Sequence, residues 1–136
     1  MYQSKQGNLG LGKAIEYFVS KGYNISIPLN DTQKYDLVVD IEDKLYRVQV
    51  KTTRHKVCNC YAVELKNTGG SSGKYKVRYF DNTKSDYLFV YVADETMYLI
   101  PCSIIKSINQ LSLNKNYEKY KVKINTMNES LNDMAV

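Results

Sequence analysis

Two apolar segments joined by a short charged turn constrain the fold of this chain more than any other feature. They are residues 35–40 (YDLVVD) and 45–52 (LYRVQVKT). Both are rich in valine, leucine and tyrosine, which favour strands, and the charged residues between them predict an antiparallel hairpin. Because both faces of these strands carry apolar residues, we expect the hairpin to lie in the centre of a sheet.

Three polar residues interrupt the apolar hairpin. Side chains alternate between the faces of a strand, so Gln49 and Lys51 project to the same side. A two-residue loop at 42–43 would place Asp36 opposite Gln49, and a loop at 43–44 would place it opposite Lys51. Either register gathers a carboxylate, an amide oxygen and an ammonium group on one face of the sheet.

The carboxylate of Asp36 is the most informative of these groups. An acid within an apolar strand is costly unless it is paired, solvated or bound to a metal. One interpretation is a structural ion pair with Lys51 or Arg47. The other is hydrolysis of a phosphodiester, in which Asp36 holds a divalent cation, Gln49 supplies a neutral oxygen ligand and Lys51 orients the attacking water. The position of Asp36 alone leaves both interpretations open.

Composition restricts the classes of protein that remain. The 136 residues, 43% of them hydrophobic, predict one folded domain. There is no apolar run long enough for a membrane span and no signal-peptide pattern, and three cysteines do not form a disulfide framework. We therefore expect a cytoplasmic protein without membrane association. The net charge of +5 favours a polyanionic partner.

The remaining patterns predict a single α/β domain with a mixed central sheet, an N-terminal helix and a second helix. Asn8 can cap a helix that runs to about Lys21, and Gly22 follows as a C-terminal glycine. The core spans about residues 5–124, and the tail 125–136 is weakly helical. Further strands are expected at 23–29, 58–66, 75–80, 86–93, 96–101 and 117–124, and a short helix at 103–111.

Several of these segments resemble the PD-(D/E)xK endonuclease superfamily. The likeness covers roughly residues 5–110 and is carried by Gly22-Tyr23, Pro28-Leu29, the two hairpin strands and the run Tyr98-Leu99-Ile100-Pro101. It points in particular to the small branch that includes the group I intron homing endonucleases of cyanobacteria, and it extends to archaeal Holliday-junction resolvases.

The resemblance implies a restriction-endonuclease-like core and a catalytic site. Asp36 matches the metal-binding aspartate, Gln49 the (D/E) position and Lys51 the lysine, and the backbone carbonyl of Val50 is a further implied ligand. The implied activity is cleavage of duplex or branched DNA with Mg²⁺, or with Mn²⁺ in its place. The implied assembly is a homodimer or homotetramer.

Two departures from the family pattern motivate an alternative function. Gln49 stands where an acid is common, and relatives often carry a carboxylate in the first helix, where this chain has Asn8 and Leu11. Glu16 is the only acid of the expected helix, and its position predicts a solvated flank. The alternative is a nuclease-fold protein that binds nucleic acid or another protein and cuts weakly or not at all.

Basic residues near the hairpin are candidate contacts to nucleic-acid phosphates, although a solvated face explains the same pattern. No zinc site is expected at His55, Cys58 and Cys60, because four ligands at a recognisable spacing are missing. The candidate nucleic-acid contacts are Arg47, Arg54, His55, Lys56, Lys74, Lys76 and Arg78.

Overall fold

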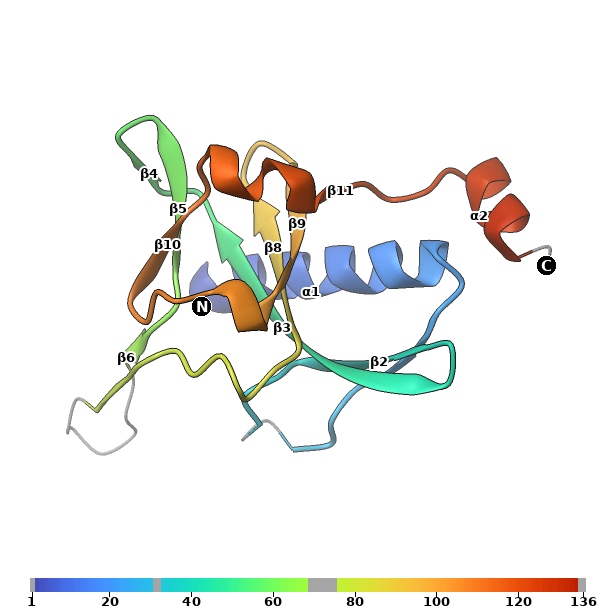
Figure 1. Ribbon diagram of the computed structural model, residues 1–136, viewed down its shortest axis with the longest axis horizontal. Helices are drawn as coiled ribbons and strands as arrows, with labels where there is room; N and C mark the ends of the chain where they lie inside the picture. The colour runs from blue at the N-terminus through green and yellow to red at the C-terminus, as the bar shows by residue number, and fades with distance from the viewer. Residues whose placement is uncertain (1, 31–32, 69–75, 135–136) are drawn as a thin grey trace.

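One long helix lies across a six-stranded sheet (Figure 1). The computed structural model describes residues 2–30, 33–68 and 76–134, so the candidate contact Lys74 lies outside the described residues. The helices are α1 (Tyr2–Ser20) and α2 (Met127–Met134), with 3₁₀ turns η1 (Cys102–Ile104) and η2 (Lys115–Tyr120). The strands are β1 (Asn24–Ser26), β2 (Leu37–Ile41), β3 (Lys44–Thr53), β4 (Lys56–Val57), β5 (Cys60–Glu64), β6 (Asn67–Thr68), β7 (Val77–Arg78), β8 (Tyr87–Val92), β9 (Met97–Pro101), β10 (Gln110–Ser112) and β11 (Lys121–Val122).

The main sheet is mixed, as the sequence predicts. Its strand order is β1-β2-β3-β8-β9-β11. Strands β3 and β8 run parallel, with Val48 opposite Tyr87 and Thr53 opposite Val92, and the other neighbours are antiparallel. The ten-residue strand β3 therefore lies inside the sheet, paired with β2 along its first half and with β8 along its second half.

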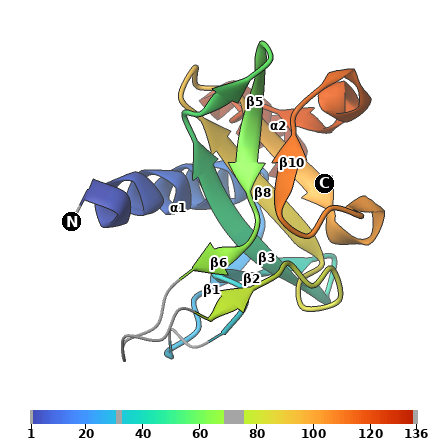
Figure 2. The ribbon, with the colours of Figure 1, turned by 90° about the vertical axis from the view of Figure 1, so that its left-hand side faces the viewer.

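Two apolar cores cover the two faces of this sheet. On one face, Ala14, Tyr17 and Phe18 of α1 pack against strand residues such as Val48 and Phe89. On the other face, the core is built from β5, β8, β9, β10 and the segment after η1. Figure 2 shows α1 on one side of the main strands and the smaller sheet β10-β5-β4 on the other. The face that carries Gln49 and Lys51 is therefore partly covered by a second layer.

The start of the N-terminal helix differs from the expectation. Helix α1 begins at Tyr2, so Asn8 lies inside the helix and does not cap it. Its end agrees with the sequence, because Gly22 adopts a positive φ of 83° and its N–H bonds to the carbonyl of Val19. The glycines in the N-terminal half of α1 are weak helix formers, and packing against the sheet overrides that weakness.

The predicted helix at 103–111 is wrong. The segment forms only the short turn η1 and then the strand β10. Ile105 is buried, but Ile108 is 49% exposed, so the isoleucines do not share one helical face. The carbonyl of Asn109 accepts the N–H of Leu65, and that of Ile108 accepts the N–H of Phe80. Hydrogen bonds to the residues that follow β5 and β7 therefore take the place of the bonds within a helix.

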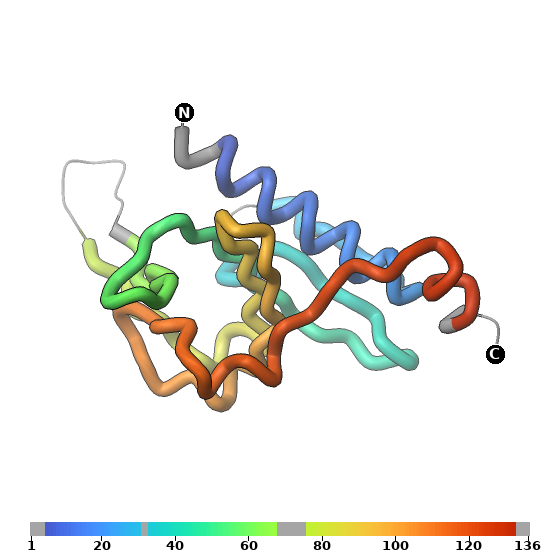
Figure 3. Tube along the Cα trace, turned by 90° about the horizontal axis from the view of Figure 1, so that it is seen from above, coloured from blue at the N-terminus to red at the C-terminus, as the bar shows by residue number. Residues whose placement is uncertain are grey.

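The second helix is α2, in the tail where the sequence is weakly helical. Asn125 leads into it, and its N–H donates to the Ser20 hydroxyl at 3.1 Å. Figure 3 shows α2 lying beyond the C-terminal end of α1. The described residues contain no helix that is long and apolar enough to cross a membrane.

Smaller differences concern the strand boundaries. The strand expected at 58–66 is interrupted, because Cys58 and Asn59 form a turn with φ values of 51° and 68° between β4 and β5. The strand expected at 117–124 is reduced to β11, and the one at 23–29 to β1 at the sheet edge. The hairpin of β8 and β9 agrees with the sequence, as does the pairing of β7 back onto β6.

Candidate active site

The register of the β2–β3 hairpin places Asp36 beside Gln49. Ile41 pairs with Lys44 and Leu37 with Val48. The loop between the strands is residues 42–43, whose φ values of 52° and 67° suit a tight two-residue turn. This confirms the first of the two registers that the sequence allows.

Asp36 immediately precedes β2 and makes hydrogen bonds to two residues of β3. Its backbone N–H donates to the carbonyl of Val48 at 2.8 Å, and its Oδ2 accepts the N–H of Val50 at 2.7 Å. The N–H and C=O of one strand residue point to the same side, so the Val50 carbonyl faces the same edge of β3 as the N–H that bonds to Asp36. The structure thus brings Asp36 and the backbone of Val50 together, as the implied ligand set requires.

Lys51 occupies the next position on β3 and has two further polar neighbours. Its Nζ donates to Oδ1 of Asn67 at 3.3 Å, and the charges of Asp36 and Glu64 both act on it. A hollow of about 320 Å³ lies beside Lys51, with Gly7 of α1 and Glu64 of β5 in its lining. The ammonium group is therefore acted on by two carboxylates, Asp36 just before β2 and Glu64 of β5.

Desolvation shifts the pKa values of both charged groups. Burial raises the pKa of Asp36, and the hydrogen bond from Val50 and the charge of Lys51 only partly oppose this. Burial lowers the pKa of Lys51, against the attraction of Asp36 and Glu64. The side chain of Asp36 is exposed at the surface. The surrounding protein therefore weakens its hydration but leaves the carboxylate accessible to solvent. A divalent cation beside Asp36 would favour its ionised form, and paired shifts of this kind are typical of functional sites.

The donor set fits a hard cation. The carboxylate of Asp36, the side-chain amide of Gln49 and the Val50 carbonyl all offer oxygen, which Mg²⁺ and Mn²⁺ prefer. Among the residues that the structure describes, no group of three or more His, Cys, Asp or Glu side chains could hold a metal ion. A metal at Asp36 would therefore rely on amide and backbone oxygens and on water for its other ligands.

Helix α1 approaches the site without supplying an acid. Asn8 is exposed, and Leu11 packs into the core on the α1 face. Glu16 is exposed, and its Oε2 lies 3.7 Å from Nζ of Lys13. This confirms the prediction that Glu16 belongs to a solvated flank of the helix. The turn nearest Lys51 carries Gly7, and a Cβ at that position would meet nothing within 4 Å.

Glu64 is the site residue that sequence reasoning missed. The alternation of strand 58–66 assigns Tyr61, Val63 and Leu65 to one face, so Glu64 falls on the other face together with Lys66. That pattern marks an ordinary wet face, and only the packing of β5 over the main sheet brings Glu64 to Lys51. The alternation of the strand could have predicted the face of Glu64, but it could not have predicted that this face would lie beside Lys51.

The predicted nucleic-acid contacts are distributed around this site. Arg78 lines a small hollow together with Gln49, and Arg54 and His55 line another beside Glu64. Lys56 lies over the ring of Tyr61, with Nζ 4.9 Å from the ring centroid, and Lys76 is exposed. Three further cations line these hollows and were not predicted: Lys34, Lys66 and Lys84.

Arg47 has a structural partner. Its guanidinium Nε lies 3.6 Å from Oδ2 of Asp86, and its Nη2 donates to the carbonyl of Thr83 at 3.3 Å. The backbone N–H of Arg47 donates to the same Asp86 oxygen at 2.7 Å. Arg47 therefore fixes the loop that leads into β8.

Comparisons with known proteins give a family for the chain and a similar fold. A sequence model of the PD-(D/E)XK endonuclease family matches residues 1–129. Among solved structures, the chain is similar to a bacterial homing endonuclease, I-Ssp6803I. The identity is 23%, the match covers 95% of this chain and 86% of that chain, and the TM-score is 0.71. A search of curated proteins finds no match.

Proposed function

The chain belongs to the PD-(D/E)XK endonuclease family, and on this premise we propose that it hydrolyses phosphodiester bonds of DNA with Mg²⁺ or Mn²⁺. One observation carries the proposal. Where β2 meets β3, the carboxylate of Asp36 bonds to the backbone of Val50, and the desolvated ammonium of Lys51 lies next along the strand. Oxygen donors beside a cationic side chain suit a divalent cation and a phosphate.

Each residue of the site has a role in this proposal. Asp36, Gln49 and the Val50 carbonyl would hold the cation, which when bound polarises the phosphate and acidifies water. Lys51 positions the attacking water and stabilises the charge that develops on the phosphate oxygens. Asn67 holds the lysine ammonium group through its side-chain oxygen. The water oxygen forms the new bond to phosphorus as the bond to the leaving oxygen breaks.

The substrate in this proposal is duplex or branched DNA, as for homing endonucleases or junction resolvases. Cations on both sides of Lys51 support a polyanion that passes across the site, with Arg78 and Lys84 on one side and Arg54 on the other. A homodimer or homotetramer would set the separation of two cuts, because a two-fold protein matches a two-fold DNA site. Sedimentation of the purified protein measures that assembly.

The test uses purified protein with plasmid and four-way-junction DNA in Mg²⁺ and in Mn²⁺. We expect cleavage that Asp36→Ala and Lys51→Ala each reduce by about 100-fold or more. Lys44→Ala is the matched control for the lysine, since Lys44 is exposed in the hairpin turn and far from Asp36 along β3. Comparing the two substrates separates a duplex-cutting enzyme from a junction-resolving one.

A second function rests on the helix next to the site. Helix α1 offers glycine where it approaches Lys51, and the carboxylate that bonds to the backbone of Val50 is that of Asp36. The alternative is a nuclease-fold protein that binds nucleic acid without cutting it. Tight binding with no cleavage of either substrate in either metal would establish this alternative and refute the enzyme.

A further inference from the structure

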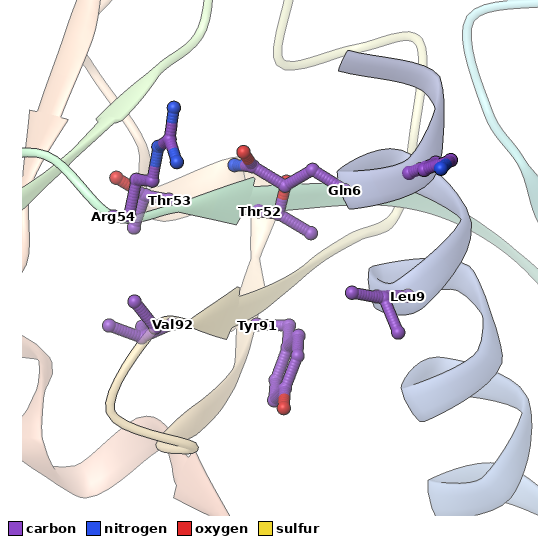
Figure 4. Close-up of a pocket in the computed structure, with 9 residues that line it drawn as sticks. Gln6, Leu9, Thr52, Thr53, Arg54, Tyr91 and Val92 are labelled. Carbon is purple, nitrogen blue, oxygen red and sulfur yellow. The ribbon is translucent and has the colours of Figure 1, made fainter. Parts of the chain in front are cut away.

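A second pocket opens between the start of α1 and the ends of β3 and β8. Figure 4 shows Gln6 and Leu9 of α1 facing Thr52, Tyr91 and Val92 of the strands, with Arg54 to one side. Its volume is about 410 Å³, within the range of small-molecule sites. We call this cavity the α1 pocket.

The lining of the α1 pocket combines apolar surface with hydrogen-bonding groups and positive charge. Leu9 is 64% exposed, and Tyr91 and Val92 lie across from it. Gln6 Nε2 donates to Thr52 Oγ1 at 3.0 Å, which places an amide at the rim. Lys5 and Arg54 add two cations, and the described lining contains no acid.

The α1 pocket and the candidate active site are linked by hollows that share lining residues. It shares Gln6, Thr52 and Arg54 with the hollow that also contains His55 and Glu64. That hollow shares Thr52, Glu64 and Lys66 with the one beside Lys51. The three hollows therefore lie one after another beside the second half of β3, from Lys51 to the α1 pocket, and we call this row of hollows the groove.

We propose that the α1 pocket receives one unpaired base of a DNA strand whose backbone lies in the groove past Lys51. This inference rests on the proposed function and specifies its substrate as DNA with an unpaired nucleotide near the cut. A base offers apolar faces for Leu9 and Tyr91 and a polar edge for Gln6, and its phosphate suits Arg54. A base inside a duplex has its faces covered by its neighbours, so only an unstacked base presents them.

The experiment compares two 20-nucleotide strands with the same number of phosphates. One is oligo(dT), and the other carries abasic sites throughout, so phosphate contacts contribute equally to both. Binding is measured by fluorescence anisotropy in Ca²⁺ at fixed salt. We expect the wild-type protein to bind oligo(dT) about tenfold more tightly than the abasic strand, as contact with one base allows.

Two variants locate this preference in the pocket. Leu9→Ala removes apolar contact, and Ala93→Leu places a larger side chain in the lining; both sites are exposed, so the fold is retained. We expect each to lower the preference to below threefold. Val19→Ala is the matched control, because Val19 is an exposed apolar residue of the same helix outside the pocket. All three variants keep the net charge.

The outcomes separate this inference from the proposed function. Equal affinity of the wild-type protein for the two strands, or an equal effect of Val19→Ala, overturns the base pocket even if the protein cuts DNA. A base preference that depends on Leu9, without cleavage of any DNA, supports the base pocket and refutes the proposed nuclease activity. If Leu9→Ala instead lowers the sedimented mass, the pocket is a contact between copies of this chain and the inference is wrong.

Discussion

Replacing Gly10 by alanine tests how closely α1 must pack against the strand that carries the site. A Cβ at position 10 would lie closer than 3.0 Å to Cγ2 of Thr52 and 3.4 Å from Cγ1 of Val50, whereas ordinary contact begins at 3.4 Å. Thr52 cannot simply rotate, because its hydroxyl accepts the hydrogen bond from Gln6. The helix must therefore move away from β3, or that hydrogen bond must break.

The magnitude follows from two opposing effects. Overpacking of this kind costs about 1–3 kcal/mol. Alanine in place of glycine inside a helix gains about 1 kcal/mol through helix propensity. Gly12→Ala is the control, since a Cβ at Gly12 in the same helix meets nothing within 4 Å. The propensity gain is common to both variants, so the difference between them isolates the contact.

Urea unfolding followed by far-UV circular dichroism measures this difference. We expect the free energy of unfolding to rise by about 1 kcal/mol in Gly12→Ala, and to be about 1–3 kcal/mol lower in Gly10→Ala than in Gly12→Ala. Cleavage should also fall in Gly10→Ala, because a displaced helix changes the hollow that Gly7 and Lys51 line together. Equal stabilisation by the two substitutions would refute the close packing of α1 on β3.

Three further outcomes follow from the structure. Burial raises the pKa of Cys102 to about 12, so Ellman's reagent should modify exposed Cys58 in the folded protein and Cys102 only after unfolding; modification of all three thiols before unfolding would contradict this. Hydrogen bonds from Thr96 lower the pKa of Asp94, so its stabilising contribution is present above the unfolded-state pKa and is lost as pH falls through the folded-state value. Asp94→Ala should therefore destabilise the protein near neutral pH and have no effect in strong acid, as unfolding at the two pH values would show. Arg54→Ala should reduce the slope of log affinity for DNA against log salt by about 1, and an unchanged slope would remove Arg54 from the phosphate contacts.

The hairpin could be predicted because its information is local. The alternation of side chains along β3 fixes the face of Gln49 and Lys51. The charged turn allows two registers, and one of them places Asp36 opposite Gln49, as in the structure. The family resemblance then gives these residues their roles. None of these steps requires contacts between distant segments.

The rest depends on long-range packing. The isoleucines near 103–111 have a helical spacing, but backbone bonds from Leu65 and Phe80 draw this segment beside β5 and β7. Glu64 has an ordinary position on a wet strand face until β5 folds over Lys51. The start of α1 could not be read from capping, because close packing at Gly10 holds a glycine-rich helix that local propensity disfavours.

The central claim is that Asp36 is needed for chemistry and not for the fold. Asp36→Asn is the most direct test, because the asparagine oxygen can still accept the N–H of Val50 while the negative charge is lost. Asp40→Asn, in the strand β2 that follows Asp36, is the control. We predict that Asp36→Asn folds and binds DNA like the wild-type protein but does not cleave it in Mg²⁺ or Mn²⁺, whereas Asp40→Asn cleaves normally. Cleavage by Asp36→Asn at the wild-type rate would contradict the account.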